Sequence, residues 1–300
     1  MRKKKYFYGS TQLDGDTFDY FGNPKSILKG RIIAFALFVV YAFCAELYPS
    51  SRYAFWAIGI LLLPWLLVRA FTFNARNSAF RGVRFDFPGT TAGAAKVYLW
   101  NTILTVVTLG IAFPWFVARQ KTFIVSHHAF GTSRFDCELS GRTFFGIYFR
   151  AGLILFLFGI LVGVFSALVL PNMALLQRFG WVAWLLPVVV MYAGYAIAFA
   201  YVQARTTNLM WMNTSAPGVR FASALEAKKL VRLYFSNIVA VACTAGLLIP
   251  WAVIRTLRYR LESFTMTVEN AVVPLANPAL APVGATGQEL GDFFNVDLSL

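Results

Sequence analysis

The sequence predicts an all-α polytopic membrane protein. It is built from two parallel internal repeats, each with two transmembrane helices and one re-entrant or kinked Pro-Trp segment, with short cytoplasmic β segments. The prediction rests on composition, on six apolar stretches, and on identities that recur at one fixed offset. Of 300 residues, 58% are hydrophobic and 13% are charged, about half the charged share of a soluble domain. Lipid is therefore the expected solvent.

Six apolar stretches are each close to the ~20 residues that a helix needs to cross the hydrocarbon core. They occupy residues 31–48, 53–72, 97–118, 147–171, 180–203 and 231–254. None has a charged residue near its centre. Hydropathy alone therefore predicts six spans.

The distribution of basic residues favours a different topology. Six spans with a cytoplasmic N-terminus would place 16 Lys and Arg residues inside and 11 outside. If the third and sixth stretches re-enter instead, only Arg52 and Arg178 of the 27 basic residues face outward. The positive-inside rule favours the re-entrant topology, with both termini in the cytoplasm. Two ordinary, kinked spans are the alternative.

Each of these two stretches contains a sequence that favours a break at its middle. The third has Thr108-Leu109-Gly110 before Pro114, and the sixth has Thr244-Ala245-Gly246 before Pro250. Glycine permits a turn, and proline cannot continue an unbroken helix. Re-entrant backbone is tolerated at depth only where protein or a water-filled cavity covers it.

Ten identities recur with a spacing of 136 residues and no gap, which predicts a duplication. The pairs are Val83, Arg84 and Phe85 with Val219, Arg220 and Phe221; Tyr98 with Tyr234; Asn101 with Asn237; Thr108 and Gly110 with Thr244 and Gly246; Pro114 and Trp115 with Pro250 and Trp251; and Arg119 with Arg255. Phe18-Asp19 and Phe135-Asp136 precede the first span of each half. Three spans per half would make the repeats inverted. Two spans make them parallel, which the matching basic flanks favour.

The predicted organisation has five parts. A basic cytoplasmic N-terminus (1–30) precedes repeat 1 (31–133) and repeat 2 (134–262); a linker (263–287) and an acidic, apolar tail (288–300) follow. The soluble insertions are 73–95, 122–146 and 206–230. Alternation of apolar residues predicts short strands at Val83–Phe87 and around Phe135 and Cys137. The tail either docks on the basic cytoplasmic face or is a frayed terminus.

The motif PWxxxR occurs three times. Its residues are Pro64, Trp65 and Arg69; Pro114, Trp115 and Arg119; and Pro250, Trp251 and Arg255. An Arg one turn beyond a Trp shares its helix face. Trp favours the headgroup level and Arg reaches the aqueous side, so the motifs predict interfacial anchors. The alternative is a lipid-headgroup or anion site formed by the three Arg residues.

Four polar residues lie inside the Pro-Trp segments. Asn101 and Thr108, like Asn237 and Thr244, are two helical turns apart and share a face. Hydrogen bonding between helices is one interpretation. A symmetric polar lining where two re-entrant segments meet is the other.

No catalytic constellation is found, so the protein is not predicted to be an enzyme. His127 and His128 are adjacent and point in different directions, which favours a solvated loop over a metal site. Ser126 beside His127 lacks the geometry of a nucleophile and its base. No metal ligand set, nucleotide loop or cofactor motif occurs. The net charge of +14 is explained by topology without nucleic acid.

The Arg-Phe-Asp-Phe sequence followed by Gly89, the segment from Thr108 to Arg119, and the terminal Val-Asp-Leu resemble the YjgN-like family of bacterial inner-membrane proteins. The resemblance covers residues 14–262 and the terminal motif, but Phe221 lacks the following Asp and Gly. It implies an inner-membrane location and no assigned activity. Because some members are encoded near membrane metallopeptidases, it also implies another envelope protein, a membrane peptidase, as a partner alongside membrane lipids.

Three functions from different classes remain. The first is a transporter or channel-like protein for a small solute or lipid, which duplication and broken helices favour. The second is a non-catalytic scaffold or regulatory partner of another envelope protein. An intramembrane enzyme is third, because acid and base groups are missing from the membrane core. The absence of charge within the spans argues against an ion-driven carrier.

Overall fold

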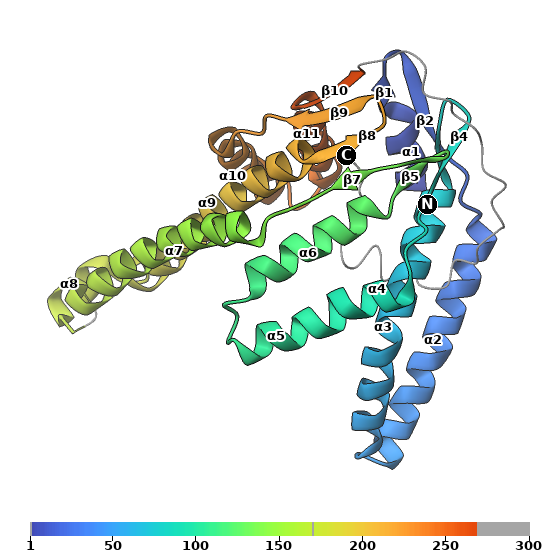
Figure 1. Cartoon of the computed structure of the whole chain (residues 1–300). Helices are drawn as coiled ribbons and strands as arrows, with labels where there is room; N and C mark the ends of the chain where they lie inside the picture. Colours follow the sequence, from blue (N-terminus) through green and yellow to red (C-terminus); the bar gives the residue numbers. More distant parts are fainter. Residues whose placement is uncertain (1, 170, 269–300) are drawn as a thin grey trace. The chain divides into compact units, whose positions relative to one another are not determined.

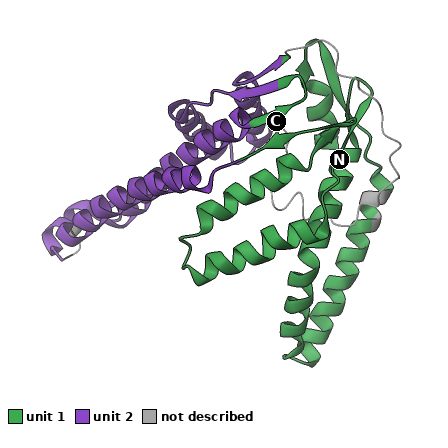
Figure 2. Ribbon diagram, in the orientation of Figure 1, with its two compact units in different colours: residues 1–138, 214–219, 268–299 green, residues 139–213, 220–267, 300 purple. Residues whose placement is uncertain are grey.

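The computed structural model describes residues 2–169 and 171–268, so the predicted 288–300 tail and most of the 263–287 linker lie outside the described residues. Helices dominate these residues, with short strands between them (Figure 1). The chain forms two compact units (Figure 2). Within the described chain, unit 1 contains residues 2–138, 214–219 and 268, and unit 2 contains residues 139–213 and 220–267.

Unit 1 has two long helices followed by a broken helical segment. Its helical elements are α1 (Arg2–Ser10), α2 (Pro24–Leu47), α3 (Ser51–Arg76), α4 (Thr91–Ala95), the π-helical turn η1 (Lys96–Trp100), α5 (Asn101–Val107) and α6 (Phe113–Ser126). Its strands are β1 (Gln12–Leu13), β2 (Asp16–Tyr20), β3 (Ser78–Phe80), β4 (Val83–Asp86), β5 (Ala129–Phe130), β6 (Ser133–Arg134), β7 (Asp136–Cys137) and β8 (Thr214–Ala216).

The strands of unit 1 confirm the predicted β segments. Strands β1 to β6 form one antiparallel meander in chain order, in which Phe18 pairs with Phe80 and Phe85 with Phe130. The ring centroids of these pairs are 4.7 and 4.8 Å apart, so aromatic cross-strand contacts set the register. The predicted strand at 83–87 is β4, and the one near Phe135 is β7, which pairs with β8.

Unit 2 also has long helices followed by a broken helical segment. Its elements are α7 (Gly141–Val169), α8 (Met173–Phe179), α9 (Val182–Met212), β9 (Val219–Ser223), α10 (Ala227–Cys243), α11 (Ile249–Glu262) and β10 (Phe264–Val268). Strand β10 lies beside β9. It occupies the start of the predicted linker, because Phe264 packs on Trp211 and Phe221 with ring centroids 4.8 and 5.8 Å apart.

Among the described residues, four helices are long and apolar enough to cross a membrane. They are α2, α3, α7 and α9, which correspond to the first, second, fourth and fifth apolar stretches. The helices extend beyond the predicted stretches, α3 to Arg76 and α9 to Met212. The soluble insertions are therefore partly helical, since a helix continues past the membrane surface until turn-forming residues end it.

The long helices pack in pairs within each unit. Helix α2 begins at Pro24, and the Asn23 side chain accepts a hydrogen bond from the Lys25 amide. The rings of Tyr41 and Phe55 join α2 to α3. In unit 2, a Cβ at Gly194 of α9 would lie 2.6 Å from the Phe158 ring of α7, so only glycine allows this close approach.

Candidate functional site

The third and sixth apolar stretches are not single helices in the structure. Helix α5 ends at Val107 and α6 begins at Phe113, while α10 ends at Cys243 and α11 begins at Ile249. Each break makes a hairpin of two helical arms. We call these hairpin 1 (residues 96–126) and hairpin 2 (residues 227–262). Pro114 and Pro250 lie in the first turn of the second arm, where a missing N–H costs nothing.

The two hairpins turn with the same backbone geometry at positions 136 residues apart. Leu109 and Ala245 have φ angles of 50° and 47°, and Gly110 and Gly246 have 90° and 91°. The Gly110 amide donates to Thr105, and the Gly246 amide donates to Val241, at 2.8 and 2.9 Å. Two consecutive left-handed residues reverse the chain, and glycine adopts the second without strain.

Thr108 and Thr244, two of the four residues of the predicted polar lining, close these turns. The Thr108 hydroxyl donates to the Leu104 carbonyl at 2.8 Å and accepts from the Ala112 amide at 3.1 Å. The Thr244 hydroxyl makes the same bonds to Ala240 and Leu248. Each hydroxyl satisfies polar backbone groups at the tip of its hairpin.

The hairpin tips are apolar and exposed. Leu109 is 93% and Leu247 is 84% exposed. Uncharged stretches of 22 residues, 97–118 and 233–254, surround the turns, with a basic residue at each end. Straight, such a stretch would be about 33 Å long, but folded in half it reaches about 16 Å. That length matches one leaflet of a hydrocarbon core about 30 Å thick.

Asn237 fastens the arms of hairpin 2 to each other. Its side chain is 8% exposed, and Nδ2 donates to the Ala252 carbonyl and to Thr256 Oγ1 at 3.2 and 3.0 Å. Arg255 Nη1 donates to Asn237 Oδ1 at 3.2 Å and to Ser236 Oγ at 2.6 Å. The buried amide therefore joins α10 to α11.

Hairpin 1 is fastened by aromatic packing instead. Tyr98, Phe123 and Phe87 belong to one buried cluster that joins both arms to α3. Asn101 is 4% exposed, and its side chain makes no hydrogen bond to any described residue. The two asparagines are thus equally buried but differ in their partners.

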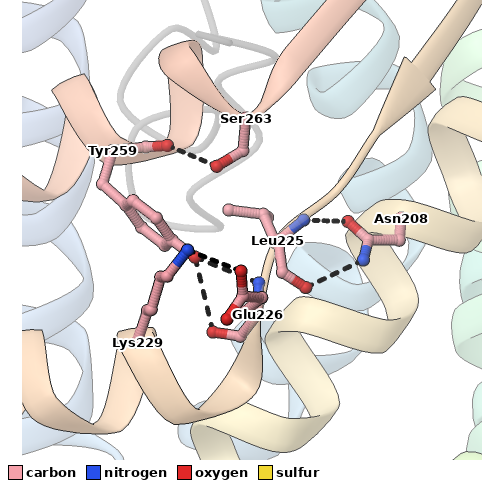
Figure 3. A network of polar contacts seen from close by, with 6 residues as sticks. All are labelled: Asn208, Leu225, Glu226, Lys229, Tyr259 and Ser263. Atoms are coloured by element: carbon pink, nitrogen blue, oxygen red, sulfur yellow. Dashed lines mark hydrogen bonds and ion pairs between the residues drawn. The ribbon is translucent and has the colours of Figure 1, made fainter.

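Asn208 anchors the base of hairpin 2, a role that sequence reasoning missed (Figure 3). Its side chain accepts from the Leu225 amide and donates to the Leu225 carbonyl, both at 2.9 Å. It also accepts from Ser223 Oγ. The 136-residue spacing relates Asn208 and Ser223 to Thr72 and Phe87, and the Thr72 hydroxyl donates to the Phe87 carbonyl. Because the residues at these positions are not identical, the recurring identities give no signal for this contact.

A second contact at the base of hairpin 2 joins its two arms (Figure 3). The Tyr259 hydroxyl accepts from the Glu226 amide at 3.0 Å. The Glu226 carboxylate pairs with Lys229 at 2.5 Å, and this exposed pair contributes little stability. The Ser263 hydroxyl donates to the Tyr259 carbonyl at 2.8 Å, which closes the end of α11.

The Arg-Phe elements serve different contacts in the two units. In unit 1, Asp86 pairs with Arg76 at 2.7 Å, with both side chains mostly buried, and Arg84 stacks over Phe21. Phe85 packs on Phe130. The positions corresponding to Arg76 and Asp86 in unit 2 are Met212 and Ala222. The missing Asp after Phe221 is thus matched by the loss of its partner.

The remaining repeat elements lie in strands or beside them. Arg220 and Phe221 lie in β9, and Phe221 is part of the aromatic cluster with Trp211 and Phe264. The Phe135 amide donates to the His128 carbonyl, and Asp136 pairs with Ser215 between β7 and β8. The contacts of these residues thus belong to the strands and the aromatic cluster.

Each PWxxxR motif places its Arg over its Trp ring. The guanidinium carbons of Arg69, Arg119 and Arg255 lie 5.1, 5.2 and 5.1 Å from the ring centroids of Trp65, Trp115 and Trp251. The motif spacing therefore produces three cation–π contacts. Arg255 alone of the three also donates to hairpin side chains within the described residues.

The histidines end α6 rather than lie in a solvated loop. His128 packs against Phe87, with ring centroids 5.0 Å apart, and its Nδ1 lies 2.7 Å from the Ile124 carbonyl. Burial lowers the pKa of His128 to about 4, so the ring is neutral at pH 7. His127 Nδ1 lies 2.9 Å from the Phe123 carbonyl and 3.3 Å from Ser126 Oγ. A nitrogen that donates to a carbonyl cannot accept a serine proton.

Comparison with known proteins supports the resemblance seen in the sequence. A model of the family described as "Bacterial protein of unknown function (DUF898)" matches residues 1–293. The inner membrane protein YjgN of Salmonella typhimurium is 20% identical over 298 residues, which cover 84% of this chain and 75% of the relative. No solved structure shows a significant match.

Proposed function

Since the chain belongs to the YjgN-like family of bacterial proteins of unknown function (DUF898), we propose that it is an inner-membrane protein that moves a small amphiphilic molecule, a lipid or a lipid-like solute. Each unit would place two spanning helices and one re-entrant hairpin in the bilayer. Both hairpins would enter from the cytoplasm, as expected for parallel copies of a duplicated module.

The observation that carries this proposal is the reversal of two uncharged stretches at their midpoints. An exposed apolar tip such as Leu109 or Leu247 is stable only in lipid or against protein. Since each arm is about 16 Å long, a tip that enters one surface stops near the bilayer midplane. This arrangement also leaves the basic residues at the arm ends, Lys96 with Arg119 and Arg232 with Arg255, at the entry surface.

The order of polar and apolar groups along each hairpin favours an amphiphile over an ion. Leucine and isoleucine side chains surround the turns, whereas buried amides, Asn101 and Asn237, lie nearer the basic ends. The uncharged stretches of the hairpins offer no ionised group to a coupling ion. A molecule with an apolar chain and a polar head would match this order, and Asn101 is the amide free to meet the head.

Lipid movement can be measured with the full-length protein in vesicles that contain a fluorescent NBD-labelled phosphatidylglycerol. Dithionite bleaches the label in the outer leaflet, so further bleaching measures movement between leaflets. We expect the intact protein to speed movement, and Asn101→Leu to slow it severalfold while the protein stays folded. Thr102→Val is the matched control, because Thr102 is exposed on the same arm and Ile238 is its counterpart.

Two outcomes would contradict the proposal. Movement no faster than in empty vesicles would reject lipid transport and favour the scaffold function. Unchanged movement in a stable Asn101→Leu protein would reject the lining role of the hairpins. The double variant Asn101→Leu with Asn237→Leu tests both amides. Because Asn237 also joins the two arms of hairpin 2, the rate of lipid movement in the single Asn101→Leu variant is the decisive measurement.

A further inference from the structure

We infer that the Trp65–Arg69 and Trp115–Arg119 stacks of unit 1 bind the phosphate groups of anionic phospholipids, and that the Trp251–Arg255 stack of unit 2 does not. The inference deepens the proposed function, on which it rests for the position of hairpin 1 in the membrane. The three motifs share the spacing of Pro, Trp and Arg, but two of them would be ligand sites and the third an internal contact.

The difference begins with the acceptors around each guanidinium. Arg255 turns Nη1 into hairpin 2, where it donates to Ser236 and Asn237. Trp100 stands in unit 1 at the position that corresponds to Ser236, so Arg119 has no hydroxyl to meet. Neither Arg69 nor Arg119 has a hydrogen bond or an acidic partner among the described residues. Their N–H groups are therefore available to a ligand.

The cation–π contact uses none of the N–H donors of either guanidinium in a hydrogen bond. The guanidinium carbons of Arg69 and Arg119 lie over the Trp rings, 5.1 and 5.2 Å from the ring centroids, and each planar group carries five N–H donors. A planar fork of donors matches two oxygens of one phosphate group. The stack also holds the Arg side chain in one conformation, which lowers the entropy lost on binding.

The level of Arg69 and Arg119 in the bilayer favours a lipid as the source of the phosphate. Helix α3 carries no charged residue between Arg52 and Arg69, and 17 residues of helix rise about 26 Å. Arg69 therefore lies one hydrocarbon thickness from Arg52, at the headgroup level where Trp side chains also gather. Arg119 ends the uncharged stretch of hairpin 1 and is exposed. Phosphodiester groups are the anions at this level.

The test measures phosphatidylglycerol retained by the purified full-length protein in detergent, with phosphatidylcholine as the neutral comparison. We expect the intact protein to prefer phosphatidylglycerol, and Arg69→Gln with Arg119→Gln to weaken its binding about fivefold at each site, the factor for one basic residue at an anionic surface. The control is Arg134→Gln with Arg142→Gln, which removes the same charge from exposed residues without a Trp stack. We expect little change there.

Three further measurements could refute the inference. Trp100→Ser gives Arg119 a hydroxyl acceptor like the Ser236 that Arg255 meets in unit 2, and it should reduce lipid binding at Arg119 although the charge of Arg119 remains. An equal loss in the Arg134 and Arg142 control would show attraction by net charge alone, and displacement by inorganic phosphate would show a free-phosphate site; either result overturns the inference. If the double variant does not fold, Arg69→Lys with Arg119→Lys keeps the charge and should still weaken binding. Because retention needs no transport, loss of flux with normal retention would refute only the proposed function.

Discussion

The two hairpins turn with the same backbone geometry, but different contacts hold their arms together. Both reverse at a Thr-x-Gly sequence with the same φ angles and the same hydroxyl bonds. Hairpin 1 is held by aromatic packing of Tyr98 and Phe123 around Phe87. Hairpin 2 is held by the amides of Asn208 and Asn237. The reversal thus depends on a few local residues, while different long-range contacts can hold the arms.

The two units should differ most in the free energy of unfolding that is lost when the buried asparagine of each hairpin is replaced. Asn237→Leu removes two donated hydrogen bonds and an acceptor for Arg255, and we expect a loss of about 3 kcal/mol in the free energy of unfolding. Asn101→Leu removes no hydrogen bond to a described residue and should cost less than about 1 kcal/mol. Reversible unfolding in detergent measures both. Equal losses of unfolding free energy in the two variants would contradict the different roles of Asn101 and Asn237 in holding the hairpins.

The shared turn predicts equal effects in the two units. Gly110→Val and Gly246→Val each force a β-branched residue to a φ near 90°, where we expect a loss of about 2 kcal/mol. No atom of the residues that the structure describes lies within 4 Å of a Cβ at Gly110, so the expected loss comes from backbone strain. Gly152→Ala in α7 is the control. A loss confined to one unit would show that the turns differ in role.

The Arg76–Asp86 pair of unit 1 can be replaced by the residues that stand at the corresponding positions of unit 2. Asp86→Ala removes the carboxylate that pairs with the mostly buried Arg76 and should cost about 1.5 kcal/mol, between the values for exposed and buried pairs. Adding Arg76→Met recreates the Met212 and Ala222 of unit 2 and should recover part of the loss. Unfolding of the two single variants and the double variant gives the coupling. Strict additivity would show that the pair contributes nothing.

His128 gives unit 1 a pH dependence that unit 2 lacks at the corresponding position, Phe264. Its pKa is lowered to about 4 in the folded state, chiefly by burial. The unfolded state binds the proton first, so stability falls as pH drops from about 6.5 towards 4. Between pH 7.5 and 5.5 we expect a loss of about 1 kcal/mol. His128→Phe should remove this contribution; an unchanged pH profile would contradict the burial of a neutral ring.

Local sequence patterns predicted the four long apolar helices and the strand at Val83. They left the third and sixth stretches open, because 22 uncharged residues suit either a straight span or a folded hairpin. Patterns could not find Asn208 at the base of hairpin 2, since its partner Leu225 is 17 residues away and gives no local signal. The sequence predicts a linker where β10 forms, because Phe264 gains its contact with Trp211 only when distant segments meet.

The central claim is that both ends of each hairpin lie on the cytoplasmic side. Single cysteines can replace four exposed residues after replacement of Cys44, Cys137 and Cys243 by serine. Thr91 and Arg134 lie on either side of hairpin 1, and Lys228 and Glu262 lie at the two ends of hairpin 2. A membrane-impermeant thiol reagent should modify none of the four in intact cells and all four after permeabilisation. Modification in intact cells at one end of a hairpin but not the other would show a spanning segment and contradict the account.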